Sequence, residues 1–232
     1  MIGAVRRWLR QRRVERWRAR GSPEDPALAR YLATFAPLDL RTPLDEARFV
    51  VVDTETTGLD IENDRILTLA AVAVDRRRLQ PGHSLDVVVA HDQVGAAAAP
   101  IHGLVRADLA EGVDEVTMLG RFLALLGNAV FVAHHAAFDE GIVGAALRRH
   151  GAPPLLNDVL CTEVLARRLV LGPFPRETSE RFPLDAAADR YRLETEARHT
   201  AAGDALLTAE LLLRLLSDAR RAGLRTLRDL LP

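Results

Sequence analysis

The chain has 232 residues, 48% hydrophobic and 27% charged, a balance typical of a soluble globular domain with a filled core. No apolar run reaches eighteen residues, and no apolar segment follows the positively charged N-terminus, so we expect neither a membrane span nor a secretory signal. Cys161 is the single cysteine. It excludes an intrachain disulfide and suits a reducing, cytoplasmic setting.

The charges are unevenly spread along the chain. All 31 basic residues are arginine, and residues 1–20 hold eight of them against one acid, a net charge of +7. Residues 21–232 hold the other 23 arginines and 31 acids, a net charge of −8. An acidic body is not typical of proteins that bind nucleic acid through bulk electrostatics, unless metal ions neutralise a local carboxylate cluster.

The first 47 residues are predicted to form a helical extension and a linker. Residues 1–20 favour an arginine-rich helix whose apolar residues scatter around its surface. After a break at residues 21–23, a second short helix that Ser22 could cap is expected to run to about residue 35, and residues 36–47 favour an extended linker. The extension could attract nucleic acid over long range, bind a protein partner, or form a mobile tail, and these alternatives stay open.

From Arg48 onward the pattern changes to that of an α/β domain. Residues 49–52 favour a buried strand, and residues 65–74 and 85–90 favour two further strands joined by a turn around residues 80–83. Helical patterns at 114–127 and 139–150 flank a strand at 129–133. Further helices are expected near 161–170, 184–191 and 200–221, with a Pro-rich loop before 184. Strands followed by alternating helices and strands indicate a mixed sheet.

Asp53 and Glu55 stand two residues apart where the first apolar strand ends. Because side chains alternate along a strand, both carboxylates point to the same face. Two acids on one face of a buried strand repel each other unless a cation or a basic group compensates their charge. Solvated acids at a strand end would give the same sequence, so the pair alone leaves a metal site and a plain surface pair open.

Two later segments add acids in comparable positions. Asp139 is expected near the start of the helix after the strand at 129–133, where an acid also stabilises the helix dipole without any catalytic role. Asp204 lies in a strongly apolar helix, so it either faces solvent or enters a site. His199, five residues earlier, falls in a loop or first turn, where a histidine is commonly only a surface residue.

Taken in order, the three segments closely resemble the DEDDh 3′→5′ exonucleases, a family that includes the epsilon proofreading subunit of bacterial DNA polymerase III, RNase T and oligoribonuclease. The resemblance covers about residues 49–216 and rests on Asp-x-Glu followed by Thr-Thr-Gly-Leu, on His-x-Ala-x-Phe-Asp, and on His-x4-Asp. It implies an RNase H-like mixed five-stranded sheet flanked by helices. Residues 48–232 would form the exonuclease domain, and residues 1–47 an N-terminal helical extension.

The resemblance also implies a chemistry. Two divalent cations, Mg²⁺ or Mn²⁺, would be held by four acids and would act on both sides of a phosphodiester displacement that releases 5′-mononucleotides. His199 would be the general base that activates the attacking water. The four acids are Asp53, Glu55, Asp139 and Asp204.

A nucleotide pocket is implied for five further residues. His102 resembles the family histidine that contacts the terminal nucleotide, and His134 matches the histidine of the second motif. Thr56 and Leu59 match the stretch that packs against sugar and base, and Phe138 could support the pocket. Turns and core packing explain the same residues, and for Phe138 core packing is the simpler interpretation.

The expected substrate is nucleic acid with a free 3′ end, with DNA favoured over RNA and no membrane partner. The short segment after the last helix favours a stand-alone or accessory enzyme over a replicative proofreader. The alternatives are an RNA-directed 3′→5′ exoribonuclease of the same family and a non-catalytic binding protein on the same fold. Inactive relatives are expected to lose ligands, and this chain keeps all four acids and His199.

Overall fold

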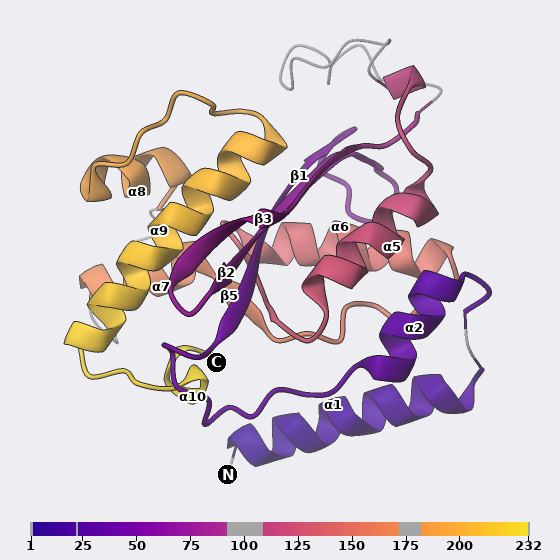
Figure 1. Ribbon diagram of the computed structural model, residues 1–232, viewed down its shortest axis with the longest axis horizontal. Helices are drawn as coiled ribbons and strands as arrows, with labels where there is room; N and C mark the ends of the chain where they lie inside the picture. The colour runs from indigo at the N-terminus through magenta and orange to yellow at the C-terminus, as the bar shows by residue number, and fades with distance from the viewer. Residues whose placement is uncertain (1, 22, 92–108, 172–181, 232) are drawn as a thin grey trace.

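The computed structural model describes residues 2–21, 23–91, 109–171 and 182–231 (Figure 1). Its five-stranded sheet has the order β3-β2-β1-β4-β5. The central strand β1 (Arg48–Thr56) pairs antiparallel with β2 (Ile66–Asp75), which pairs antiparallel with β3 (Arg78–Val88). On its other side β1 pairs parallel with β4 (Val130–Ala133), and β4 pairs parallel with β5 (Val159–Cys161). The predicted mixed sheet of five strands is confirmed.

Helices cover both faces of this sheet. Because the side chains of β1 alternate between the two faces, they contribute to two separate core clusters. Val50 and Val52 point into a cluster with α5 (Glu115–Leu126) and α6 (Ala136–Arg149). Phe49 and Val51 point into a second cluster with α7 (Thr162–Leu171), α8 (Leu184–Tyr191) and α9 (Ala201–Arg221). Burial on both faces explains why β1 and β2 are continuous apolar runs in the sequence.

The hairpin between β2 and β3 corrects one prediction. The turn lies at Arg76 and Arg77, which have positive φ angles of 48° and 60°, and not at residues 80–83. Residues 81–83 instead lie inside β3, where Val72 pairs with Ser84 and Ala73 with Gln80 across a shift of register. Proline and glycine are tolerated in such a bulge on an edge strand, so their turn signal was placed wrongly.

The N-terminal extension forms two helices, α1 (Ile2–Ala19) and α2 (Pro26–Thr34). Asp25 caps α2 by accepting the backbone N–H groups of Ala27 and Leu28, and Pro26 occupies the first turn; Ser22, the expected cap, lies outside the described residues. The Tyr31 hydroxyl of α2 donates a 2.7 Å hydrogen bond to Asn157. The second helix of the extension is therefore packed into the core of the α/β domain.

The remaining elements are close to their predicted positions. Helix α6 begins three residues before Asp139, and the helices expected at 114–127, 161–170, 184–191 and 200–221 agree with the structure to within a residue or two. The sequence pattern gave no separate signal for β5 or for the short α10 (Leu227–Leu230). Among the described residues, no helix is both long and apolar enough to cross a membrane.

Candidate metal centre and active site

The C-terminal end of β1 presents acids on the face that α9 covers. Because side chains alternate along β1, Asp53 and Glu55 point to the same face of the sheet as Phe49 and Val51, whose side chains pack against α9. Both acids are half-buried. The chain then turns away at Thr57, whose backbone N–H donates to the Arg65 carbonyl. As the strand period predicts, the two carboxylates lie on one face at a sheet end.

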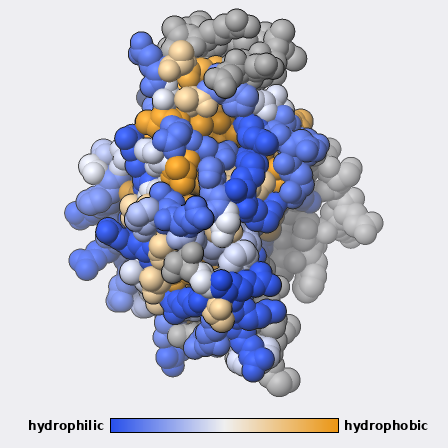
Figure 2. All heavy atoms as spheres, turned by 90° about the vertical axis from the view of Figure 1, so that its right-hand side faces the viewer, coloured by the Kyte–Doolittle hydropathy of each residue, from blue (hydrophilic) through white to orange (hydrophobic). Residues whose placement is uncertain are grey.

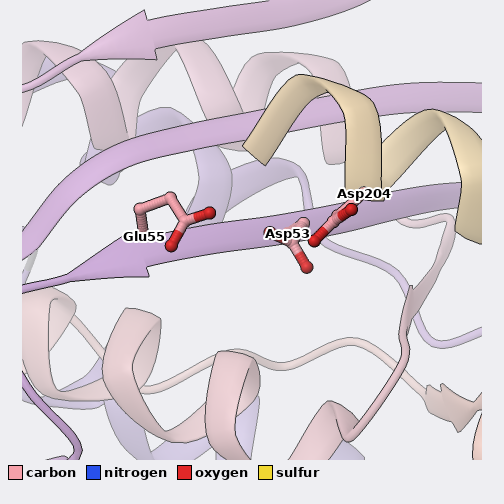
Figure 3. A group of neighbouring side chains, drawn as sticks. All are labelled: Asp53, Glu55 and Asp204. Carbon is pink, nitrogen blue, oxygen red and sulfur yellow. The ribbon is translucent and has the colours of Figure 1, made fainter. Parts of the chain in front are cut away.

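The first turn of α9 adds Asp204 to this pair. The nearest ligand oxygens of Asp53, Glu55 and Asp204 all lie within 4.8 Å of one another. Figure 3 shows the Asp204 carboxylate extending from the helix toward Asp53 on the strand. Carboxylates from two segments that are distant in sequence, β1 and α9, thus form one cluster.

Small residues allow α9 to come this close to the sheet. Ala70 of β2 packs against Ala201 and Ala205 of α9, and all three are buried. The loop before α9 also approaches closely, since a Cβ atom on Gly203 would lie only 1.8 Å from the Ala197 carbonyl oxygen. Larger side chains at these positions would push Asp204 away from β1.

Asp139 approaches the cluster from the other face of the sheet. It lies in the first turn of α6 and is only 4% exposed. Thr54, between the two acids of β1, donates a 2.9 Å hydrogen bond to the Asp139 carboxylate. Asp139 is not a member of the three-carboxylate cluster, yet its charge contributes to raising the pKa of Asp53. The four predicted acids therefore gather around the end of one strand.

The electrostatics of these acids favour a bound cation. Burial raises the pKa of Asp53 well above its ordinary value, and the charges of Asp139, Asp204 and Glu55 raise it further. Burial also raises the pKa of Asp139, to about 7. Clustered buried carboxylates are costly without a compensating charge, and oxygen-only ligands suit hard divalent cations such as Mg²⁺ or Mn²⁺. The residues present therefore fit such ions.

Arg198 is a component of the site that the sequence analysis missed. Its guanidinium forms ion pairs with Asp204 and, at 2.6 Å, with Asp185 of α8. Burial opposes the charge of Arg198, but its hydrogen bonds to both acids hold its pKa above the ordinary value. The only signal in the sequence was its position next to His199.

His199 lies on the loop that leads into α9, as the sequence indicated. Its side chain is exposed, and its backbone adopts a left-handed conformation with φ of 64°. Thr200, the next residue, caps α9 by accepting the N–H of Gly203 at 3.1 Å. The loop that carries His199 is therefore tied to the helix that carries Asp204, and the role of His199 as the base stays a prediction.

His134 is enclosed by hydrogen bonds. Its two ring nitrogens lie 2.9 Å from the Thr162 hydroxyl and 2.8 Å from the Phe182 carbonyl oxygen. The side chain is buried, and mainly for that reason its pKa falls to about 4. In this arrangement His134 joins the start of α7 to the segment before α8, and its contact with a nucleotide stays a prediction.

The other residues of the predicted nucleotide pocket have differing environments. Leu59 is 85% exposed on the turn after β1, whereas Thr56 is buried and donates a 2.6 Å hydrogen bond to the Gly58 carbonyl. Phe138, in the first turn of α6, is half-buried. His102 lies outside the described residues. The roles of these residues in substrate binding stay predictions.

The sheet order and the carboxylate cluster define an RNase H-like α/β domain built to hold metal ions at the end of its central strand. The model of the exonuclease family RNase_T matches residues 50–212, which is more than half of the chain. The chain therefore belongs to this exonuclease family, and its acidic motifs are those of the DEDDh 3′→5′ type.

Two curated relatives carry names from DNA replication. A DNA polymerase III subunit epsilon-like protein of Rhodobacter capsulatus is 36% identical over 196 residues, which are 80% of this chain and 26% of that protein. A PolC-type DNA polymerase III of Halalkalibacterium halodurans is 32% identical over 182 residues, which are 76% of this chain and 12% of that protein. The chain thus spans about a quarter of the first relative and about an eighth of the second.

Solved structures with a similar fold are also exonucleases. Exonuclease X in complex with 5′ overhanging duplex DNA has a TM-score of 0.57 at 24% identity, over 75% of this chain and 93% of that one. Escherichia coli exonuclease I in complex with a dT13 oligonucleotide has a TM-score of 0.65 at 18% identity, over 77% of this chain and 43% of that one. At these identities the likeness establishes the shared fold.

Proposed function

We propose that this chain removes nucleotides one at a time from the 3′ end of DNA and releases 5′-mononucleotides. The observation that carries the proposal is the convergence of Asp53, Glu55 and Asp204 within 4.8 Å, with Asp139 beside them. The family match supports the reaction class. The names of the relatives and the DNA in the similar structures favour DNA over RNA.

In the proposed reaction, the acids of the site would bind the cations and His199 would transfer the proton. Asp53, Glu55 and Asp204 would hold the cations, with Asp139 contributing from the α6 side. Divalent cations bound there would neutralise charge on the phosphodiester and lower the pKa of water. His199 would accept a proton from the attacking water at an imidazole nitrogen, and its exposed position on the loop leaves that nitrogen accessible to solvent.

A nuclease assay tests the proposal directly. The full chain is incubated with 5′-labelled single-stranded, duplex and mismatched DNA and with short RNA, in Mg²⁺, Mn²⁺ or EDTA. We expect stepwise shortening of the labelled DNA from its 3′ end, release of 5′-mononucleotides that chromatography of the unlabelled products identifies, and no reaction in EDTA. Faster shortening of RNA would make the chain an exoribonuclease, and binding without cleavage in either metal would contradict an enzymatic function.

Asp53→Asn supplies the matched loss-of-function variant. It removes one charge from the acid cluster with little change of shape, so we expect hydrolysis to fall by at least about 10³-fold while the fold is kept. Circular dichroism and the melting temperature in EDTA monitor the fold. A variant that hydrolyses DNA at the wild-type rate would exclude Asp53 from the metal centre.

A further inference from the structure

Arg198 places a positive charge on a proposed metal ligand. Its side chain is only 15% exposed, and one of its terminal nitrogens pairs with the Asp204 carboxylate, which is itself mostly buried. The Nε atom of the same guanidinium lies 2.6 Å from Asp185 at the start of α8. Arg198 thus joins two acids, of which only Asp204 belongs to the carboxylate cluster.

This position makes Arg198 a competitor of any cation that binds Asp204. The oxygen of Asp204 that forms the ion pair with the guanidinium is in the same carboxylate that would ligate a metal ion. A guanidinium and a divalent cation a few ångströms apart in a partly buried site repel each other strongly. Binding of a metal ion at Asp204 therefore requires the guanidinium to withdraw or costs affinity if it stays.

The second ion pair offers Arg198 a place to withdraw to. Asp185 lies on α8, outside the cluster, with a side chain that is 61% exposed, and it pairs with the Nε atom rather than with the terminal nitrogen that contacts Asp204. A small movement of the whole planar guanidinium toward α8 would release Asp204 while Asp185 still neutralises the guanidinium. The two acids thus give Arg198 two positions, one on the metal ligand and one beside it.

The loop around Arg198 connects this change to His199. Residues 197–200 are held against α9 by the Thr200 hydroxyl, which donates a 3.0 Å hydrogen bond to the Ala197 carbonyl, and by the close approach of that carbonyl to Gly203. His199 lies within this loop with a left-handed backbone. Because Arg198 and His199 are adjacent in this hydrogen-bonded loop, a shift of Arg198 would bear directly on the position of His199.

We propose that Arg198 is a built-in counter-ion that neutralises Asp204 when no metal is bound, and that a divalent cation displaces it toward Asp185 and so adjusts the loop that carries His199. The inference rests on the proposed metal-dependent function. It makes Arg198 a positioning residue for the metal centre, distinct from the ligands and from the base.

Metal binding without substrate separates this role from a purely structural one. Isothermal titration of the full chain with Mn²⁺ gives the dissociation constant, and melting in EDTA gives the stability of the metal-free protein. For Arg198→Gln we expect about tenfold tighter Mn²⁺ binding together with a lower melting temperature in EDTA. Arg198→Lys, which keeps the charge, should restore the melting temperature in EDTA and much of the wild-type Mn²⁺ affinity.

Arg148→Gln is the matched control, because Arg148 pairs with Glu62 at 2.7 Å on the exposed surface, away from the carboxylate cluster. Arg148→Gln should change neither the Mn²⁺ dissociation constant nor the melting temperature in EDTA. Unchanged or weaker Mn²⁺ binding by Arg198→Gln would overturn the inference and leave the exonuclease proposal intact. Wild-type protein that binds no Mn²⁺ would overturn both.

Nuclear magnetic resonance of the wild-type protein provides a second measurement, which remains possible even if Arg198→Gln does not fold. The Nε–H signal of Arg198, assigned by its loss in Arg198→Lys, should shift on titration with diamagnetic Mg²⁺ and saturate with the Mg²⁺ dissociation constant measured by calorimetry. Its hydrogen should stay protected from exchange, since the bond to Asp185 persists. A signal that does not respond to saturating Mg²⁺ would contradict the displacement.

Discussion

Successive side chains of β1 reach acids on different helices because they point to opposite faces of the sheet. Asp53 and Glu55 face α9 and meet Asp204, whereas Thr54 faces α6 and donates its hydrogen bond to Asp139. A one-residue slip of this strand would exchange the two sets and disperse the carboxylates. Three consecutive residues therefore organise acids from both layers of helices.

The role of His199 is testable with a single substitution. His199→Ala removes the proposed base but none of the carboxylates, so we expect turnover to fall by about 10²–10⁴-fold while Mn²⁺ affinity changes little. Single-turnover rates and calorimetry measure the two quantities. Retention of the full rate at neutral pH would show that another group accepts the proton.

Buried His134 predicts a pH dependence of stability. Burial lowers its pKa to about 4 in the folded chain, below the ordinary value of 6.5. The unfolded chain therefore binds more protons between these values, and this contribution to stability is complete above about pH 6.5 and is lost as the pH falls toward 4. His134→Gln should flatten that part of the profile of unfolding free energy against pH.

Urea denaturation in EDTA at several pH values measures this effect for His134. The control is His83→Gln, at an exposed position of β3, which should leave the profile unchanged. Equal slopes for wild type and His134→Gln between pH 4 and 6.5 would contradict the assignment of the effect to this histidine.

At the scale of elements, the junction between the His199 loop and α9 depends on a missing side chain. Gly203→Ala would place a Cβ atom 1.8 Å from the Ala197 carbonyl oxygen, so the loop or the helix must move. We expect a loss of about 1–3 kcal/mol in the free energy of unfolding and weaker Mn²⁺ binding, since Asp204 is the next residue.

Gly144→Ala provides the helical control for this substitution. Gly144 lies within α6, and a Cβ atom there would meet its nearest neighbour, the Arg148 side chain, at an ordinary 3.6 Å. Alanine is the better helix former, so this variant should be as stable as wild type or more stable by up to about 1 kcal/mol. Equal stabilities for Gly203→Ala and Gly144→Ala would show that the close approach is unimportant.

The observed helices, strands and turns show which local sequence patterns were sufficient to predict an element. Helix α9 was predicted to within a residue or two because its apolar residues recur with the helical period over many turns. The three-residue β5 carries too few residues for a periodic signal. The β2–β3 turn was misplaced because two arginines with positive φ give no turn signal, whereas Pro81 and Gly82 in the bulge do.

At the scale of the whole molecule, α1 runs below the sheet in Figure 1, whereas the first turn of α9, which carries Asp204, lies near the upper end of the sheet. Figure 2, which faces the right-hand side of that view, shows mainly hydrophilic side chains in the lower part of the molecule. Arg12, Arg13 and Arg16 are exposed. We expect these side chains to contact phosphates away from the 3′ end.

Replacing these three arginines with glutamine tests that interpretation. Binding of a long single-stranded DNA should weaken, and the slope of log affinity against log salt should become shallower by up to about two units, because each lost phosphate contact on single strands contributes about 0.7. Fluorescence anisotropy at several salt concentrations measures the slope. An unchanged slope would favour a protein partner for α1.

Arg18 is left intact in that variant for a structural reason. Its guanidinium donates hydrogen bonds to the carbonyls of Leu32, Ala33 and Phe35 at the end of α2, the closest at 2.8 Å. Truncation of α1 would remove these bonds together with Val14, a buried member of the core cluster that contains Leu28 and Tyr31. Substitution of the exposed arginines therefore tests the effect of their charge on DNA binding without the loss of stability that deletion of residues 1–20 would cause.

The sequence by itself determined what depends on neighbours a few residues apart. The strand period put Asp53 and Glu55 on one face, the helical period located α5 and α9, and the order of the acidic motifs indicated the exonuclease family. Tertiary structure decided what depends on packing between distant segments. Ala70, Ala201 and Ala205 let Asp204 approach β1, and the pairing of Arg198 with Asp204 and Asp185 emerged only when α8 and α9 were placed together. Periodicity specifies which face a side chain takes, but the distance between two faces is set by the side chains packed between them.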